Sequence, residues 1–218
     1  MSGKEQLFEV SLEREGAYRS ISAALEAAGC RIIRAAVPDR EAVPLIAALK
    51  EHTGMPVVAD IHFDYRLALE AVAAGADKIR INPGNIGGAD RVRAVANACN
   101  ERKIPIRVGV NSGSVERELL ARFGGPTAEA MVESAARHLK MLEEADFENT
   151  VLSLKSSDLK TMVAAYRLAA ERFDCPLHLG VTEAGTERQG VVKSSIGIGS
   201  LLLDGIGDTI RISLTADP

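Results

Sequence analysis

Residues 78–111, KIRINPGNIGGADRVRAVANACNERKIPIRVGVN, contain one complete unit of the fold. Apolar residues alternate with polar ones over residues 78–83 and 105–111, and this alternation predicts two strands. Between them, residues 91–103 have apolar positions at helical spacing and predict a helix. A strand, a helix and a second strand in this order predict two parallel strands with the helix covering one face of the pair.

The same alternation continues in both directions along the chain. Helices separate further predicted strands over residues 31–37, 56–63, 150–157, 176–183, 209–216 and, as the eighth, 7–12. Eight strand–helix units predict an α/β fold, a TIM (β/α)8 barrel, whereas a doubly wound open sheet usually has fewer strands. No linker divides residues 1–218, so we expect one domain. The chain ends directly after the last strand, and we therefore expect a barrel that lacks its last outer helix and derives from a longer protein.

Composition argues against several classes of function. A net charge of −4 and an aromatic content of 4% without tryptophan argue against nucleic-acid binding. Residues 1–16 carry charges throughout and no segment is long enough to cross a membrane, so we expect a cytoplasmic protein without a membrane partner. Cys30, Cys99 and Cys175 form no C-x-x-C pair, so we expect buried thiols and no metal site.

The predicted strands carry polar side chains on a face that is normally apolar in buried parallel strands. The alternation places these residues opposite Ile79 and Ile81, inside the barrel and near the carboxyl ends of the strands. They are Arg34, Asp60, His62, Arg80, Asn82, Arg107, Asn111, Ser153, Lys155, His178, Thr182, Arg211 and Ser213. Five of them are formal cations and only Asp60 is an anion, so their convergence predicts an anionic ligand. Arginine suits phosphate in particular, because it binds phosphate through two parallel hydrogen bonds.

We expect Glu183, Asp60 and His62 to serve in catalysis and the other polar residues, apart from Ser153, to bind substrate. Glu183 follows the strand over residues 176–183 and is placed where an acid or base would act. Lys193 and Ser194 open a predicted helix over residues 194–205, either as a phosphate site or as an ordinary serine cap. In the alternative interpretation, the cations of the strands pair with acidic residues elsewhere or extend to the mouth of the barrel.

Five segments of the chain are recognisable as those of a known family. They are VADIHFDYRLAL (58–69), KIRINPGNIG (78–87), IPIRVGVNSGS (104–114), PLHLGVTEAG (176–185) and VKSSIGIGSLLLDGIGDTIRISLTADP (192–218). They closely resemble the 4-hydroxy-3-methylbut-2-enyl diphosphate synthases, the GcpE family of isoprenoid biosynthesis by the methylerythritol phosphate pathway. The resemblance implies a TIM barrel that binds 2-C-methyl-D-erythritol 2,4-cyclodiphosphate, a separate C-terminal domain with a [4Fe-4S] cluster, flavodoxin or ferredoxin as electron donor, and a homodimer.

The chain departs from this family in two places. The cluster-binding motif, of the type C-P-T-C, is absent, which implies that the ligands of the [4Fe-4S] cluster lie in a domain that this chain lacks and that the chain alone binds no cofactor and is inactive. The first strand of the family and its Q-S-M-T loop are not recognisable in residues 1–28, so we expect an atypical first strand. Two other functions stay open, a pterin-binding transferase barrel similar to dihydropteroate synthase and a non-catalytic diphosphate-binding module.

Overall fold

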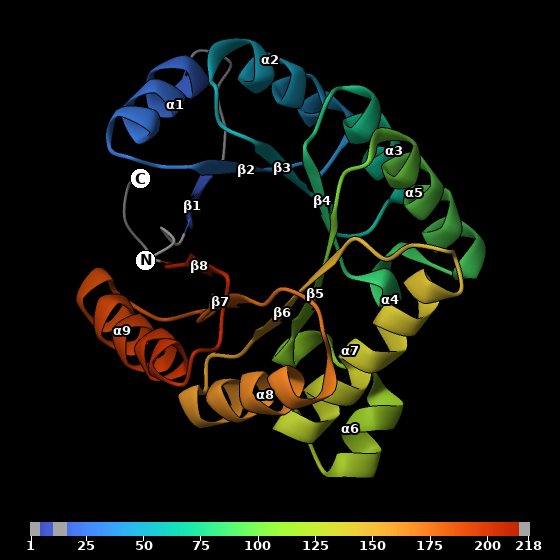
Figure 1. Ribbon diagram of the computed structural model, residues 1–218, viewed down its shortest axis with the longest axis vertical. Coiled ribbons are helices and arrows are strands. Elements are labelled where there is room, and N and C mark those ends of the chain that lie inside the picture. Colours follow the sequence, from blue (N-terminus) through green and yellow to red (C-terminus); the bar gives the residue numbers. More distant parts are fainter. Residues whose placement is uncertain (1–4, 11–16, 214–218) are drawn as a thin grey trace. The chain divides into compact units, whose positions relative to one another are not determined.

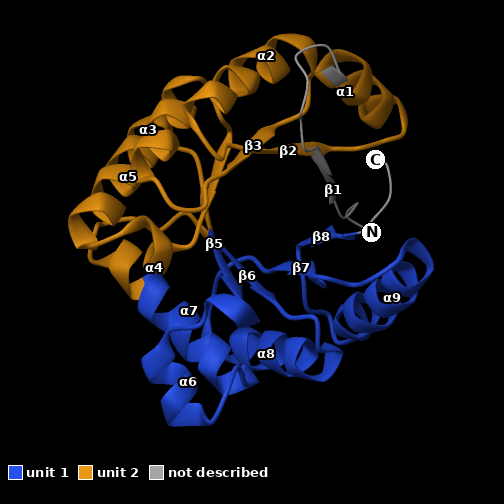
Figure 2. Ribbon diagram, turned by 180° about the vertical axis from the view of Figure 1, so that it is seen from behind, with its two compact units in different colours: residues 1–4, 108–139, 151–217 blue, residues 5–107, 140–150, 218 orange. Residues whose placement is uncertain are grey.

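The computed structural model describes residues 5–10 and 17–213, in which strands and helices alternate (Figure 1). The chain divides into two compact units, and each is described by itself (Figure 2). Unit 2 comprises residues 5–107 and 140–150, and unit 1 comprises residues 108–139 and those from 151 onward. None of the helices in the described ranges is both long enough and apolar enough to cross a membrane.

Unit 2 contains a sheet of parallel strands, β1 to β4. Leu7 of β1 lies opposite Ile32 of β2, Ala36 of β2 lies opposite Asp60 of β3, and the same residue, Asp60, lies opposite Arg80 of β4. The elements are β1 (Glu5–Val10), α1 (Ala17–Ala27), β2 (Ile32–Ala36), a 3-10 turn (Arg40–Ala42), α2 (Pro44–His52), β3 (Val57–Asp60), α3 (Tyr65–Ala73), β4 (Lys78–Ile81), α4 (Pro83–Ile86) and α5 (Ala89–Arg102).

Unit 1 continues the same alternation from β5 onward. The elements are β5 (Ile106–Asn111), which begins in unit 2, a 3-10 turn (Ser112–Ser114), α6 (Arg117–Phe123), α7 (Ala128–Glu143), which ends in unit 2, β6 (Thr150–Lys155), α8 (Leu159–Arg172), β7 (His178–Gly180), α9 (Glu187–Leu203) and β8 (Thr209–Arg211). A parallel bridge joins Leu152 of β6 to Leu177, just before β7. The strands β7 and β8 are also parallel, with His178 opposite Thr209.

The core lies between the apolar face of the strands and the helices. Ile79 and Ile81 of β4 are fully buried, as are Val92 and Cys99 on the inner face of α5. In unit 1, helix α9 approaches α8 closely at Gly197, where a Cβ atom would lie 2.7 Å from Cε of Met162. The alternation read from residues 78–111 therefore correctly predicts which side chains enter the core.

Several predicted boundaries are wrong. The segment that follows β4 contains the short helix α4, because Asn82 caps it and Pro83 occupies its first position, where proline fits a helix. Helix α9 begins at Glu187, so Lys193 and Ser194 lie within it and do not open it. The predicted strands over 7–12 and 209–216 correspond to β1 and β8, and residues 11–12 and 214–216 lie outside the described residues.

Candidate functional site

Three side chains from neighbouring strands of unit 2 form a buried charged cluster. Asp60 ends β3 and its carboxylate accepts a hydrogen bond of 2.9 Å from Nη1 of Arg80 on β4. Nη2 of Arg34 on β2 lies 3.5 Å from the other carboxylate oxygen of Asp60. The side chains of Arg34 and Asp60 are each 4% exposed and that of Arg80 is 12% exposed. Two guanidinium groups therefore share one carboxylate within the protein interior.

The cluster keeps Asp60 ionised. Burial favours the neutral carboxyl group, but the contacts with His62, Arg34 and Arg80 outweigh it and hold the pKa of Asp60 well below its ordinary value. Burial also lowers the pKa of Arg34, and the charge of Asp60 opposes that effect. His62 lies beyond the end of β3, where its side chain is half-exposed and its Nε2 atom is 3.5 Å from Asp60. The prediction that His62 lies within a strand is therefore wrong, although its ring contacts the carboxylate of buried Asp60.

Asn82 and Arg107 are the other predicted site residues of unit 2. Both are buried, at 4% and 2% exposed. The side chain of Asn82 accepts a hydrogen bond of 3.1 Å from the backbone N–H of Gly84 and so caps α4. Asn82 thus has a local structural role through its side-chain oxygen. Its amide NH2 group can donate hydrogen bonds, so this role is compatible with ligand binding. Arg107 lies on β5 with Ile106 and Val108, which are fully buried on the opposite face.

Lys155 and Arg211 end their strands in unit 1, whereas His178 begins β7 and so does not lie at the carboxyl end where it was predicted. Lys155 ends β6 and is 6% exposed, and its side chain extends over Gly180 of β7. His178 is 1% exposed, and its Nδ1 atom forms a hydrogen bond of 2.7 Å with the hydroxyl of Thr209 on β8. Burial lowers the pKa of Arg211 to about 10, so this residue stays charged at neutral pH. Unit 1 therefore carries one buried cation, Lys155, and one half-buried cation, Arg211, on the polar face of its strands.

Four further predicted residues of unit 1 are more exposed. Asn111 is half-buried at the end of β5, where its backbone N–H donates to the hydroxyl of Ser114. Thr182 and Ser213 are half-buried and follow β7 and β8. Glu183 is exposed and has a φ of 49°, a left-handed backbone conformation that is unfavourable for residues other than glycine. Such conformations gather at functional sites, which is compatible with the predicted role of Glu183.

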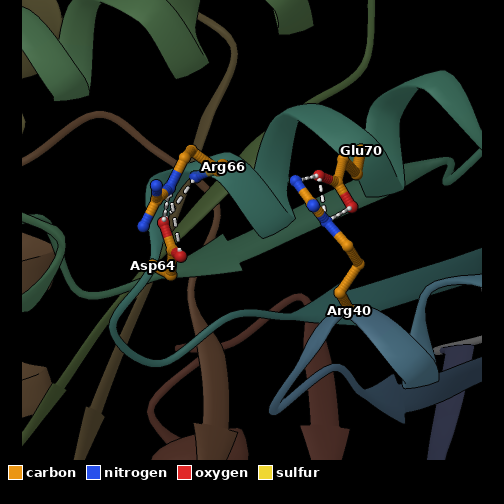
Figure 3. Close-up of polar contacts among 4 residues, drawn as sticks. All are labelled: Arg40, Asp64, Arg66 and Glu70. Carbon is orange, nitrogen blue, oxygen red and sulfur yellow. Dashed lines mark hydrogen bonds and ion pairs between the residues drawn. The ribbon is translucent and has the colours of Figure 1, made fainter.

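Exposed ion pairs on the outer surface of unit 2 provide a contrast to the buried cluster. Arg66 contacts Asp64 at 3.1 Å, and Arg40 contacts Glu70 with a hydrogen bond of 2.6 Å (Figure 3). The arginine side chains of these pairs are 66% and 77% exposed. Water and salt screen such pairs, so they contribute little to stability. The Coulomb attraction between the same residue types in the buried cluster is screened much less by water and salt.

The cysteines do not fit an iron–sulfur cluster. Cys30 and Cys99 are buried and Cys175 is half-buried, so two of the three thiols are buried as predicted. Burial raises the pKa of Cys99 to about 12 and that of Cys175 to about 11, whereas metal ligation requires thiolates. No group of three or more potential ligand residues gathers among the side chains that the structure describes. The described residues therefore offer no site for a metal cluster.

Sequence reasoning missed Tyr166 and Gly180. Tyr166 of α8 is fully buried, and its hydroxyl donates a hydrogen bond of 2.6 Å to the carbonyl of His178 and accepts one of 3.0 Å from the N–H of Leu154. At helical spacing Tyr166 had the appearance of an ordinary core residue. The signal in the sequence is a tyrosine at an apolar position of a predicted helix, because a tyrosine that is buried there requires a partner for its hydroxyl.

Comparison with known proteins identifies the family. The family described as "GcpE TIM-barrel domain" matches residues 13–218. The 4-hydroxy-3-methylbut-2-en-1-yl diphosphate synthase (flavodoxin) of Ruminiclostridium cellulolyticum is 59% identical over 194 residues, which are 89% of this chain and 55% of that protein. The enzyme of the same name from Clostridium perfringens is 57% identical over 89% of this chain and 56% of its own length. The chain thus spans about half the length of these relatives.

Solved structures support the barrel fold. A dihydropteroate synthase from Yersinia pestis aligns with a TM-score of 0.67 and 15% identity over 96% of this chain and 86% of its own. The enzyme from Clostridium difficile aligns with a TM-score of 0.64 and 14% identity. At this identity the likeness concerns the fold alone, which is α/β with parallel strands and resembles a TIM barrel. By the match of its sequence, the chain belongs to the GcpE family and carries the TIM-barrel domain of that family.

Proposed function

We propose that this chain is the substrate-binding barrel of an enzyme that reductively converts 2-C-methyl-D-erythritol 2,4-cyclodiphosphate to 4-hydroxy-3-methylbut-2-enyl diphosphate. The observation that carries the proposal is the set of cations on the polar face of the strands, of which Arg34, Arg107 and Lys155 are buried and Arg80 and Arg211 are half-buried. A diphosphate supplies anionic oxygens in the geometry that arginine binds. The relatives, which are 57–59% identical, are named as diphosphate synthases.

The residues of the chain have distinct roles in this proposal. Arg107, Lys155 and Arg211 bind the phosphate oxygens, together with the pair of arginines that Asp60 orients. Asn82, Asn111, His178, Thr182 and Ser213 donate or accept hydrogen bonds to the substrate. Asp60, His62 and Glu183 hold or move protons as the ring of the substrate opens. Because Asp60 is ionised and its pKa is held low, it acts as an acceptor or an orienting group and not as an acid.

The electrons for the reaction are proposed to come from outside this domain. The described thiols do not fit a cluster, so we assign no redox step to residues of this chain. In the complete enzyme a separate domain would hold the [4Fe-4S] cluster, and flavodoxin or ferredoxin would reduce it. The relatives carry flavodoxin in their names. We also retain the proposals that residues 1–218 act as one domain, that the first strand is atypical, and that the protein is a cytoplasmic homo-oligomer.

Calorimetric titration of the chain with the cyclic diphosphate, at fixed ionic strength, tests the proposal. The unmodified chain should bind it, and R107A should weaken binding at least about tenfold, because a charge-assisted hydrogen bond contributes about 1.5–3 kcal/mol. The matched control is R66A, which removes an equal charge from the exposed surface (Figure 3) and should leave the affinity unchanged. Absence of binding, or equal affinity of R107A and the unmodified chain, would refute the proposal.

The same titration tests the pterin-binding alternative, and a turnover assay tests the non-catalytic one. Tighter binding of a pterin diphosphate than of the cyclic diphosphate would favour a transferase of the dihydropteroate synthase type, although the resemblance to those enzymes concerns the fold alone. For the non-catalytic alternative, a cluster-bearing domain of the same family is added in trans with a reductant. Turnover in that mixture, and none by the chain alone, is the result that we expect. Binding without turnover would favour a module that only binds diphosphate.

A further inference from the structure

We propose that Tyr166 and Gly180 are positioning residues that set the place of the Lys155 ammonium group. Neither residue was assigned a role by the pattern of the strands. Both lie in unit 1 with Lys155, and each acts on the geometry of β6 and β7. The proposal rests on the proposed function only in that Lys155 binds an anion, and its structural part can be tested without any ligand.

The hydroxyl of Tyr166 occupies the place of a hydrogen bond between strands. The ladder between β6 and β7 begins with the backbone N–H of Leu152, which donates to the carbonyl of Pro176 at 2.9 Å. In a regular parallel ladder the next N–H of β6 on this side, that of Leu154, would donate directly to the carbonyl of His178. Both groups instead bond to the hydroxyl of Tyr166, at 3.0 and 2.6 Å. The hydroxyl therefore keeps the two strands apart at the residue that precedes Lys155.

The side chain of Lys155, the residue after Leu154, lies over the neighbouring strand β7. A Cβ atom on Gly180 would lie 3.2 Å from Cε and 3.5 Å from Nζ of Lys155, so the lysine side chain rests directly on the backbone of β7. The same Cβ atom would lie 3.1 Å from the carbonyl oxygen of Arg211 on β8. Gly180 thus provides the space in which the ammonium group reaches over β7 toward β8.

The two features act together. If the strands joined directly, Leu154 and with it Lys155 would move toward β7, and the side chain would lose the space above Gly180. If Gly180 had a side chain, the ammonium group would be displaced even with the strands apart. Removal of the hydroxyl and addition of a methyl group are therefore expected to displace the same atom by independent routes.

The first experiment needs no ligand. The chain is labelled with 13C at the lysine Cε atoms, and the resonance of Lys155 is identified by its loss in K155M. We expect this resonance to shift in both Y166F and G180A. Y18F, which removes another tyrosine hydroxyl from helix α1 in unit 2, should leave it in place. An unchanged Lys155 resonance in both variants would overturn the proposal, even if Y166F lowers the melting temperature.

The second experiment measures the affinity for inorganic pyrophosphate by calorimetry well below the melting temperature. We expect Y166F and G180A each to weaken binding about five- to tenfold, the effect of losing one well-placed polar contact. In a K155M background the same substitutions should have almost no further effect. An equal loss in both backgrounds would show that Tyr166 acts on stability and not through Lys155. Should the unmodified chain fail to bind pyrophosphate while the Lys155 resonance still shifts, the proposed function would fail and the positioning role would stand.

Discussion

Replacement of Asp60 by asparagine should make the stability of the folded chain depend on a bound anion. Asparagine preserves the shape of the side chain but removes the negative charge that lies 2.9 Å from Arg80 and 3.5 Å from Arg34. Removal of one partner from a buried ion pair costs about 3–5 kcal/mol. We expect the lower end of this range, about 3 kcal/mol, because the amide oxygen still accepts a hydrogen bond and Arg80 retains some contact with water.

Thermal unfolding at fixed ionic strength and pH 7 measures this effect. For a chain of this size, 1 kcal/mol corresponds to about 2–4 °C, so D60N should melt roughly 6–12 °C below the unmodified chain. Pyrophosphate should partly restore the loss, since its charge replaces that of the carboxylate. A ligand at 100 times its dissociation constant adds about 2.7 kcal/mol to the free energy of unfolding. If D60N binds pyrophosphate more tightly than the unmodified chain, its melting temperature should rise more at the same ligand concentration.

The matched control is Asp64→Asn. Asp64 is the N-cap of α3 and pairs with exposed Arg66, and asparagine caps a helix as well as aspartate does, so D64N should melt like the unmodified chain. The pH dependence supplies a second check. Because the pKa of Asp60 is lowered in the folded chain, its contribution is complete above the unfolded pKa of about 3.9 and declines as the pH falls below it. The reasoning is refuted if D60N and D64N have the same melting temperature. It is also refuted if pyrophosphate raises the melting temperature of D60N no more than that of the unmodified chain.

Three further predictions concern single residues. Glu183→Gly should raise the melting temperature and Glu183→Ala should not, because only glycine relieves the cost of a φ of 49°; equal melting of the two variants would contradict this. Burial lowers the pKa of His138 despite Glu116 at 3.2 Å, so the unfolded chain binds the proton more readily and stability should fall as the pH drops below about 6.5. Denaturant titrations from pH 8 to 5 measure this, and H138Q should flatten the profile. With pKa values raised to about 12 and 11, Cys99 and Cys175 should react with a thiol reagent at pH 7 only as the chain unfolds, and rapid reaction of both in the native chain would count against their burial.

The alternation along β4 was sufficient to predict which of its side chains are fully buried. Ile79 and Ile81 enter the core while Arg80 between them joins the charged cluster. This success has a physical reason, because side chains of a strand point to opposite faces with a strict period of two. Prediction was weaker beyond the strand ends. There His62 is half-exposed, since no period constrains a loop.

Contacts that join different elements could not be predicted from the sequence. The bond of Tyr166 to the backbone of β6 and β7 depends on how α8 packs, and the spacing of residues along a helix does not specify the partner of a buried hydroxyl. The start of α9 was missed for a related reason. Glycine has a low helix propensity, but Gly190 is buried within α9, where tertiary packing decides the conformation.

The sequence also could not show how the charges of unit 2 are balanced. A count of cations predicts an anionic ligand but does not exclude that acidic side chains neutralise them. The structure shows that Asp60 contacts both Arg34 and Arg80, so one carboxylate is shared by two guanidinium groups. Asp60 therefore orients the two arginines by contacts that the sequence did not specify, and D60N tests whether this orientation serves the anion site that we propose.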